Sequence, residues 1–425
     1  MLLLAGLLVV VLDGARGDSG AAAARLADPP ALAGRVPSAA AADQVRALLV
    51  RRAQAIRDRD RDAFAATLDP RADPGFRTTQ LAMFANLAGV PLAHWEYAIN
   101  PADAAPVPVG AVDPSADELW APATELRYAL AGADTYPTSR PAGYLYARRG
   151  ARWYLASDTA LDTVGRPTWR GPWDFGPCLV ARVNRGVVIG HPGSEKLVRQ
   201  LAAELDPAVG AVSSVWGTGW AQRIGVVVPS TAAEQDALVG PRYTTDSIAA
   251  VSIADQVDRA ANRAYGQRVV LNSGSHAQLG PTALRVVLRH ELTHVAARTA
   301  TDEHTPLWLQ EGMAEYVGYR GSGLPAAEIA PGLTDGVRTG RLPSRPPADA
   351  AFGGPGLVLA YQQSWSLMSY LAGRLGPDGL VALYRRLASH PDAATQPQLD
   401  ATLRAVLGTD LAGVVAGWHE ELERP

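Results

Sequence analysis

The chain has 425 residues, enough for two or three domains, and its apolar fraction of 48% is ordinary for a globular protein. Charged residues make up 19% and the formal net charge is −3, which argues against a nucleic-acid partner or a polybasic membrane patch. The single cysteine, Cys178, excludes an intramolecular disulfide and a metal site built from several thiolates.

The N-terminal sequence favours export. Residues Leu2–Leu12 form an unbroken apolar run, too short to span a bilayer but suited to the hydrophobic core of a secretory signal. Ala21, Ala22 and Ala23 offer small residues for cleavage, whereas the usual basic start is missing, so the true start lies upstream or the run is an uncleaved anchor. We interpret residues 1–24 as a signal peptide or N-terminal anchor. The protein is then extracytoplasmic, either secreted or tethered to the outer face of the cell membrane.

An Ala-, Gly- and Pro-rich linker is predicted over residues 25–41, followed by a first domain over 42–165. Residues 43–69 show helical periodicity, and the charged run RDRDRD within them is typical of an exposed helix face. Segments rich in aromatic and β-branched residues follow, and 142–158 (AGYLYARRGARWYLASD) predicts a hairpin that turns at Arg149-Gly150. One long helix followed by hairpins predicts an α+β domain that resembles the cone-shaped nuclear-transport-factor-2-like fold.

The second region, 169–424, alternates strands and helices before a run of C-terminal helices. Residues 281–299 (PTALRVVLRHELTHVAART) predict one helix, with Pro281 in its first turn. His290 and His294 are four positions apart, so both imidazoles stand on one helix face and can bind one metal ion. Glu291 lies beside them, where a carboxylate can accept a proton from a metal-bound water. The same five-residue pattern also occurs on helices without metal, so a third ligand has to be found.

The downstream segment HTPLWLQEGMAEYVGY supplies that ligand. The metzincin extension is excluded, because Ala297 and Ala300 stand where Gly and His would be required. Thr305 and Pro306 predict the start of a return helix, and Glu311 lies on it, 17 positions after His294.

Glu315 lies one helical turn beyond Glu311, on the same face, where it can accept the second N–H of a metal-bound histidine. The alternative, a solvated helix face, is opposed by the apolar residues around the two glutamates. A buried and unpaired carboxylate pair would be costly, and a metal with its histidines removes that cost. Gly312 and Ala314 are small enough to let neighbouring helix backbones approach closely.

HELTH followed by PLWLQEGMAEY resembles the peptidase MA-like group of gluzincin zinc metallopeptidases, which are related to thermolysin and the zinc aminopeptidases. The resemblance covers roughly residues 170–424 and is specific over 286–320. It implies a zincin-like domain over 169–424, with Zn²⁺ bound by His290, His294 and Glu311 and with Glu291 as the general base. The gap before the third ligand is a little shorter here than in those relatives.

In the related aminopeptidases a tyrosine from a later helix stabilises the oxyanion, and Tyr361 is our candidate for that donor. A merely packed tyrosine is the open alternative. Tyr316 and Tyr319 are weaker rivals, and Tyr370, among apolar neighbours in the middle of a helix, is interpreted as a core residue. His304 is an alternative metal ligand, although its polar loop favours a surface position. The resemblance also implies that the strand RVVLN, residues 268–272, pairs with an extended substrate.

These observations predict an α+β protein, with an N-terminal helix-plus-curved-sheet domain followed by a zincin-like domain whose C-terminal part is mainly helical. They predict an exported zinc peptidase that acts on peptide or protein substrates through a zinc-activated water. No Glu-rich motif for binding a free amine is evident, which favours internal cleavage. A second hypothesis is an inactive metallopeptidase-fold scaffold or binding protein at the cell surface. The sequence leaves the oligomeric state open.

Overall fold

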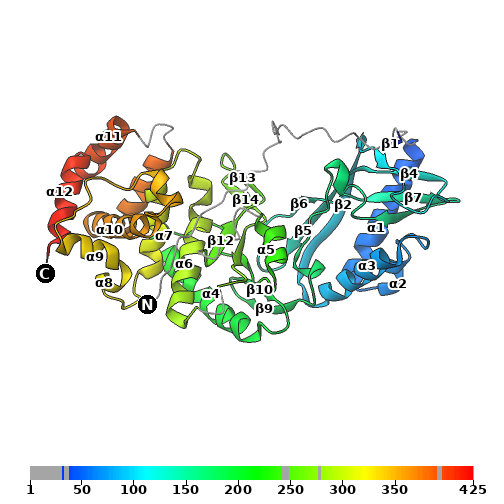
Figure 1. Cartoon of the computed structure of the whole chain (residues 1–425), viewed down its shortest axis with the longest axis horizontal. Helices are drawn as coiled ribbons and strands as arrows, with labels where there is room; N and C mark the ends of the chain where they lie inside the picture. Colours follow the sequence, from blue (N-terminus) through cyan, green and yellow to red (C-terminus); the bar gives the residue numbers. More distant parts are fainter. Residues whose placement is uncertain (1–30, 33–37, 241–247, 276–278, 390–394, 425) are drawn as a thin grey trace. The chain divides into compact units, whose positions relative to one another are not determined.

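The computed structural model describes residues 31–32, 38–240, 248–275, 279–389 and 395–424. They form two compact units, one of residues 31–180 with 189–195 and the other of 181–188 with 196–424 (Figure 1). The predicted signal or anchor, 1–24, and most of the predicted linker, 25–41, lie outside the described residues. Within the described part, no helix is long and apolar enough to cross a membrane.

The first unit combines helices with two three-stranded sheets, ordered β2-β5-β6 and β4-β7-β8. Its helices are α1 (Ala39–Asp58), α2 (Arg61–Ala65) and α3 (Pro74–Asn86), with short 3-10 turns at Leu87–Gly89, Asp162–Val164 and Pro172–Asp174. Its strands are β1 (Ala31–Leu32), β2 (Leu92–Ala104), β3 (Val107–Pro108), β4 (Glu118–Trp120), β5 (Pro122–Leu130), β6 (Thr138–Pro141), β7 (Leu145–Arg149) and β8 (Arg152–Ser157).

The long helix predicted over residues 43–69 is interrupted. Helix α1 buries the predicted apolar face, but it ends at Asp58, and Arg59 adopts a left-handed conformation with φ of 59°. The Asp60 side chain then accepts hydrogen bonds from the backbone N–H groups of Asp62 and Ala63 and caps α2. The RDRDRD run is exposed as predicted, but the helix breaks within it at Arg59 and Asp60, because Asp60 caps a new helix.

The predicted hairpin is present as β7 and β8, which pair antiparallel from Leu145 with Ser157 to Arg149 with Arg152. Its two-residue turn is Gly150-Ala151, one position later than predicted, and Gly150 has the positive φ that such a turn requires. The resemblance to the nuclear-transport-factor-2-like fold and the domain limits 42–165 and 169–424 stay predictions.

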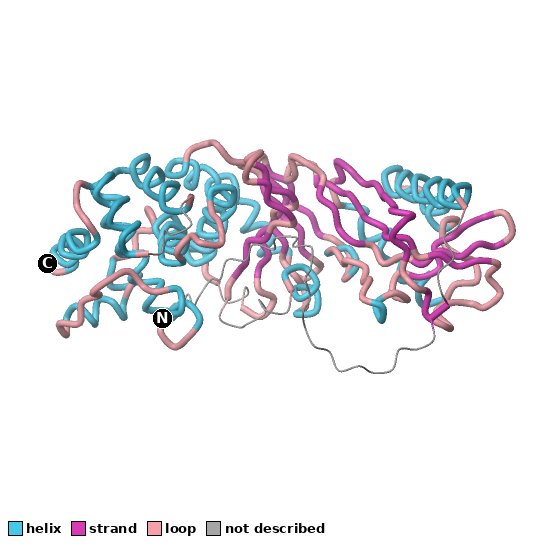
Figure 2. Tube along the Cα trace, turned by 90° about the horizontal axis from the view of Figure 1, so that it is seen from above, coloured by secondary structure: helices cyan, strands magenta, loops and turns pink. Residues whose placement is uncertain are grey.

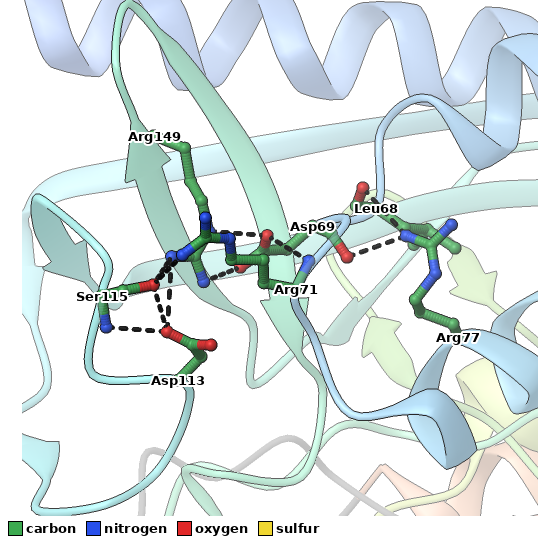
Figure 3. A network of polar contacts seen from close by, with 7 residues as sticks. All are labelled: Leu68, Asp69, Arg71, Arg77, Asp113, Ser115 and Arg149. Atoms are coloured by element: carbon green, nitrogen blue, oxygen red, sulfur yellow. Dashed lines mark hydrogen bonds and ion pairs between the residues drawn. The ribbon is translucent and has the colours of Figure 1, made fainter.

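A polar network ties β7 to two loops of the first unit (Figure 3). Arg149 contacts both carboxylate oxygens of Asp69 at 2.8 Å, and its guanidinium also donates to Ser115 Oγ at 2.9 Å. Arg71 donates to the same hydroxyl at 2.7 Å, while Arg77 donates to the backbone carbonyl of Asp69 at 2.8 Å. Asp69 is buried, so these contacts compensate for the desolvation of its charge.

The second unit is built on a five-stranded sheet with the order β12-β15-β11-β10-β9. Strands β11 and β15 are parallel, and β12 pairs antiparallel with β15. Strand β15 (Arg268–Leu271), which was expected to pair with substrate, is an inner strand with neighbours on both sides, so that expectation is wrong. The edge strand beside it, within the described residues, is β12 (Ala250–Ile253). The remaining strands are β9 (Leu179–Val183), β10 (Gly186–Gly190), β11 (Ile224–Val227), and the small pair β13 (Gln256–Asp258) and β14 (Arg263–Tyr265).

The rest of the second unit is mainly helical (Figure 2). Its helices are α4 (Glu195–Trp216), α5 (Ala232–Val239), α6 (Pro281–Ala297), η6 (Arg298–Ala300), α7 (Leu307–Tyr319), α8 (Ala326–Ile329), α9 (Pro331–Arg338), η7 (Asp349–Gly353), α10 (Leu357–Ala388), α11 (Gln396–Leu407) and α12 (Leu411–Leu422). Helix α10 is kinked at Gly376, whose φ is 67°. The predicted α+β class, with its helix-plus-sheet N-terminal part and mainly helical C-terminal part, is confirmed.

Helix α7 packs against both α6 and α10. A Cβ at Gly318 would lie 3.1 Å from the Val286 carbonyl on α6, and a Cβ at Gly312 would lie 2.7 Å from the Ser364 carbonyl on α10. The predicted close approach of helices at Gly312 is thus present. Helix α7 begins at Leu307 with Pro306 as its N-cap, one residue later than expected, because the Thr305 hydroxyl bonds to Asp302 instead of capping the helix.

We expect Gly312→Ala to lower the free energy of unfolding by roughly 1–3 kcal/mol, because the added methyl overpacks the α7–α10 contact. Urea unfolding followed by circular dichroism measures this. Gly210→Ala is the matched control, since Gly210 lies exposed on α4 with nothing within 4 Å of its added Cβ. That control should be neutral or stabilising by up to about 1 kcal/mol. Equal stability of Gly312→Ala and the parent would contradict the close approach.

Candidate metal centre

Helix α6 presents the two histidines to the interior. Pro281 occupies its first turn as predicted, and the apolar stripe of the helix packs on β12 and β15. His290 and His294 are 1% and 5% exposed, and their rings meet edge to face with centroids 4.7 Å apart. The spacing of four positions therefore places both imidazoles in one buried pocket of the fold.

Glu311 reaches the same point from α7. Its Oε2 lies 3.3 Å from His290 Nε2 and 3.5 Å from His294 Nε2, and the two Nε2 atoms are 3.0 Å apart. Ligand atoms from these three residues all lie within 4.8 Å of one another. A tetrahedral ion with bonds of about 2.0–2.1 Å would separate its ligands by about 3.3 Å. The spacing of the three atoms therefore fits a zinc-sized ion.

The hydrogen bonding of Glu311 supports the same conclusion. The side chain is 1% exposed, yet neither carboxylate oxygen has a hydrogen bond of acceptable geometry in the described part of the chain. A buried carboxylate in that state is costly unless a cation neutralises it. Two imidazoles and one carboxylate also form a donor set that zinc prefers at catalytic sites.

Glu315 orients one of the histidines. Its Oε1 lies 3.0 Å from His290 Nδ1, which leaves His290 Nε2 to face His294 and Glu311. This is the contact expected of a carboxylate that fixes the tautomer of a metal-binding imidazole. The structure thus places Glu315 where the sequence predicted it.

The charges of the three candidate ligands are strongly coupled. Burial alone would raise the pKa of Glu311, but the two histidines outweigh it and lower that pKa to about 2. Burial alone would lower the pKa of His290, whereas Glu311 and Glu315 outweigh it and raise that pKa to about 10. Burial lowers the pKa of His294 to about 4. Without a metal, one proton on His290 therefore balances the Glu311 carboxylate.

Glu291 lies on the same helix with 1% exposure, and its Oε1 has no hydrogen-bond partner in the described part of the chain. Burial raises its pKa to about 8, with a further increase from Glu311, whereas His290, Ser252 and Arg298 lower it. A carboxylate with a pKa near neutrality is suited to accept and return a proton.

Ser252 and Arg298 are parts of this site that the sequence did not identify. Arg298 is 2% exposed and donates from Nη2 to the Ser252 carbonyl at 2.9 Å and to its hydroxyl at 3.0 Å. Arg298 follows Glu291 by seven positions, two helical turns, so the two share a face. The spacing of seven positions could have identified Arg298 as a neighbour of Glu291. Nothing in the sequence around Ser252 indicates that this strand residue contacts Arg298.

Tyr361 stands beside the candidate ligands on α10. Its ring centroid is 6.5 Å from that of His290 and 5.4 Å from that of Phe352, and the side chain is buried. Burial, followed by the charge of Glu311, raises the pKa of Tyr361 well above its usual value. The hydroxyl therefore stays protonated and can act as a hydrogen-bond donor.

The rival residues lie in other surroundings. The hydroxyl of Tyr370 accepts from Arg374 at 3.4 Å, and Tyr319 packs edge-on against Trp365. Tyr316 is half-buried on α7. The side chain of His304 is half-exposed and its Nε2 lies 3.6 Å from Glu303. Among these candidates, Tyr361 is the one whose ring lies against His290.

The C-terminal sequence matches the model of the Peptidase MA superfamily over residues 252–424. The match covers less than half of the chain, and it supports a gluzincin-like peptidase fold for that part. The matched segment begins in β12 and includes both histidines and all three glutamates of the α6–α7 pair. No curated protein gives a significant match to the sequence.

Several solved structures are similar to the chain. One is an M1 zinc metallopeptidase mutant from Deinococcus radiodurans bound to a Tyr-Ser-Ala substrate, at 14% identity and a TM-score of 0.32, covering 58% of this chain and 52% of the other. Another is a two-domain M1 zinc metallopeptidase mutant bound to L-tryptophan, at 13% identity and a TM-score of 0.31, covering 58% and 51%. The chain thus spans about half the length of these two M1 enzymes.

A third structure is a conserved protein of unknown function from Bacillus anthracis str. Ames, at 10% identity and a TM-score of 0.32. The similarity extends over 70% of this chain and 68% of the Bacillus anthracis protein. The function proposed below therefore rests on the residues of the α6–α7 centre.

Arg298 provides a test of this arrangement. We expect Arg298→Leu to lower the free energy of unfolding by roughly 2–3 kcal/mol, because it leaves the buried Ser252 groups without their charged donor. Arg298→Lys keeps the charge and should lose less. Urea unfolding measures both. If the leucine and lysine variants were equally stable, the hydrogen bonds to Ser252 would have no measurable role.

Proposed function

We propose that this protein is an exported, zinc-dependent peptidase that hydrolyses peptide bonds at the α6–α7 centre. The observation that carries the proposal is the convergence of His290, His294 and Glu311, whose ligand atoms are buried and spaced as a zinc ion would require. The export proposal is motivated by the apolar run Leu2–Leu12.

His290 and His294, through Nε2, and Glu311, through a carboxylate oxygen, would hold the ion. Zinc bound there supplies a lowered pKa for a coordinated water and polarisation of the scissile carbonyl. Glu315 accepts the Nδ1 proton of His290 and so keeps its Nε2 lone pair directed toward Glu311 and His294. Each of these roles uses a contact that the metal-free side chains already make.

Glu291 acts as the general base. Its carboxylate takes a proton from the attacking water and delivers it to the leaving nitrogen. Ser252 and Arg298 lie beside Glu291 and lower its pKa, which favours the ionised carboxylate that a general base requires. Tyr361 donates a hydrogen bond to the carbonyl oxygen as negative charge develops on it.

Glu291→Gln tests the chemistry. We expect cleavage of a peptide mixture to fall by at least about a hundredfold, because the amide cannot accept the proton, while bound zinc remains. Mass spectrometry measures cleavage and elemental analysis measures zinc. Undiminished cleavage would exclude Glu291 as the base.

His290→Ala tests the metal. We expect this variant to lose its zinc and the activity that depends on it, because two ligands bind the ion far more weakly than three. His304→Ala is the matched control, since His304 is exposed in the loop before α7. Elemental analysis and activity with and without a chelator are the measurements. Zinc that is bound without turnover in the parent protein would favour the scaffold hypothesis.

Tyr361→Phe separates the two roles open to that residue. An oxyanion donor predicts a loss in kcat of about 10²–10³ with KM and zinc content nearly unchanged. A merely packed tyrosine predicts an unchanged kcat, because phenylalanine preserves the ring contacts with His290 and Phe352. Steady-state kinetics on one cleaved peptide decides between them.

A further inference from the structure

A cavity of about 480 Å³ adjoins the candidate metal centre, and we call it the inner cavity. Glu315 and Tyr361 belong both to its wall and to the surroundings of His290. Its other walls come from α6, the segment from Leu324 to Pro331, and α10. Because the wall includes residues in contact with a candidate ligand, a substrate side chain next to the cleaved bond can enter this cavity.

The inner cavity is apolar with a negative end. Most of its wall consists of aliphatic side chains and Trp365, which Tyr319 contacts edge-on. The charged side chains that line it are both carboxylates, Glu315 and Glu328. Glu315 is engaged by His290, whereas Glu328 is exposed and makes no ion pair within the described residues. The free charge of this cavity is therefore that of Glu328.

A second cavity, of about 790 Å³, adjoins the first, and we call it the outer cavity. The two share Ala327 and Trp365 as wall residues. The rest of its wall comes from α8, α9, α10, α12 and the residues next to these helices. Its charged lining residues are Arg338, Arg374, Arg424 and Glu421. The inner cavity is thus lined by negatively charged side chains and the outer cavity mainly by positively charged ones, and Trp365 lines both.

Two of these arginines are neutralised by neighbours. Arg338 lies 2.8 Å from Asp335, and Arg424 lies 2.6 Å from Glu421. Arg374 contacts only the ring and hydroxyl of Tyr370 among the interactions of the described residues, so its charge has no carboxylate partner there. Each cavity consequently offers one unpaired charge, negative at Glu328 and positive at Arg374.

We propose that the substrates of this site are peptides that carry a basic side chain beside the cleaved bond and an acidic side chain a few residues away. The apolar walls of the inner cavity bind the aliphatic stem of Lys or Arg, and Glu328 binds the charged end. The outer cavity binds the acidic side chain at Arg374. This inference rests on the proposed peptidase function.

The charges of the two cavities should discriminate mainly by repelling substrates of the wrong charge, and less by attracting substrates of the right charge. Each exposed charge pair contributes little, whereas a substrate whose charges are exchanged meets a like charge in both cavities at once. A purely apolar pocket would accept uncharged bulky side chains equally well, so charge discrimination is the property to measure.

The experiment is a cleavage profile of a peptide library from a bacterial proteome, cut beforehand by chymotrypsin so that Lys, Arg, Asp and Glu remain internal. The full-length protein with its zinc is added with and without a chelator, and cleavage sites are read by mass spectrometry. We expect Lys or Arg at one position beside the cleaved bond, and Asp or Glu enriched a few residues away.

Glu328→Lys should lower the preference for basic over acidic residues at the first position by about fivefold, and Arg374→Glu should lower the second preference by a similar factor. Glu420→Lys and Arg386→Glu are the controls, since they make the same charge changes at exposed positions outside both cavities. The two controls should leave the profile unchanged.

Three results would overturn the inference. The first is chelator-sensitive cleavage with no charge preference, and the second is a preference that Glu328→Lys and Arg374→Glu do not alter. The third is cleavage that acts only on the first residue of a peptide and stops when its amine is acetylated, which would assign Glu328 to a terminal ammonium. Absence of any chelator-sensitive cleavage would instead contradict the proposed peptidase function.

Discussion

The second unit depends on one buried carboxylate, that of Glu311. A carboxylate that is 1% exposed and has no hydrogen-bond partner among the residues that the structure describes is unstable in a protein interior unless positive charge lies beside it. Here the neighbours are His290 and His294, whose nitrogens lie 3.3 and 3.5 Å away. Helices α6 and α7 therefore have to pack closely enough to bring the three side chains together. That requirement accounts for the two glycines of α7.

Those glycines act on opposite faces of the helix. Gly318 lets α7 approach the backbone of α6 near His290, and Gly312 lets it approach the backbone of α10 at Ser364. Helix α10 also carries Tyr361, so the same contact that seats Glu311 brings the tyrosine to the ligands. The position of the candidate donor thus follows from the packing of α7 between its two neighbours.

Residues that are close in the sequence could be placed in the site from their spacing. Contacts between residues that are far apart in the sequence could not be predicted. His290 and His294 are one helical turn apart on α6, and Glu311 and Glu315 are one turn apart on α7, which a sequence displays directly. The family resemblance, rather than spacing, joined the two pairs. Ser252 comes from strand β12 and precedes Arg298 by 46 residues, so only the fold brings the two together. The placement of β15 was wrong for the same reason. Strand order in a sheet is decided by tertiary pairing, and β15 pairs with β12 on one side and β11 on the other.

The break at Arg59 is a local feature that the periodicity hid. An alternating run of arginines and aspartates suits an exposed helix face. An aspartate is also a favourable N-cap, however, and Asp60 is the N-cap of α2. Hydrophobic spacing alone could not distinguish the two, because the apolar stripe continues from Ile56 into Phe64 on either side of the turn.

The charges around the centre indicate what a divalent ion would displace. Three carboxylates, those of Glu291, Glu311 and Glu315, gather around two imidazoles, and Arg298 is a buried cation beside Glu291. Burial raises the pKa of Glu291 to about 8, so at neutral pH this carboxyl group is mainly protonated. Glu311, Glu315 and Arg298 then leave one negative charge, which a proton on His290 compensates, in agreement with its pKa of about 10. A divalent cation would take the place of these protons, so its binding should release protons from His290 and Glu291.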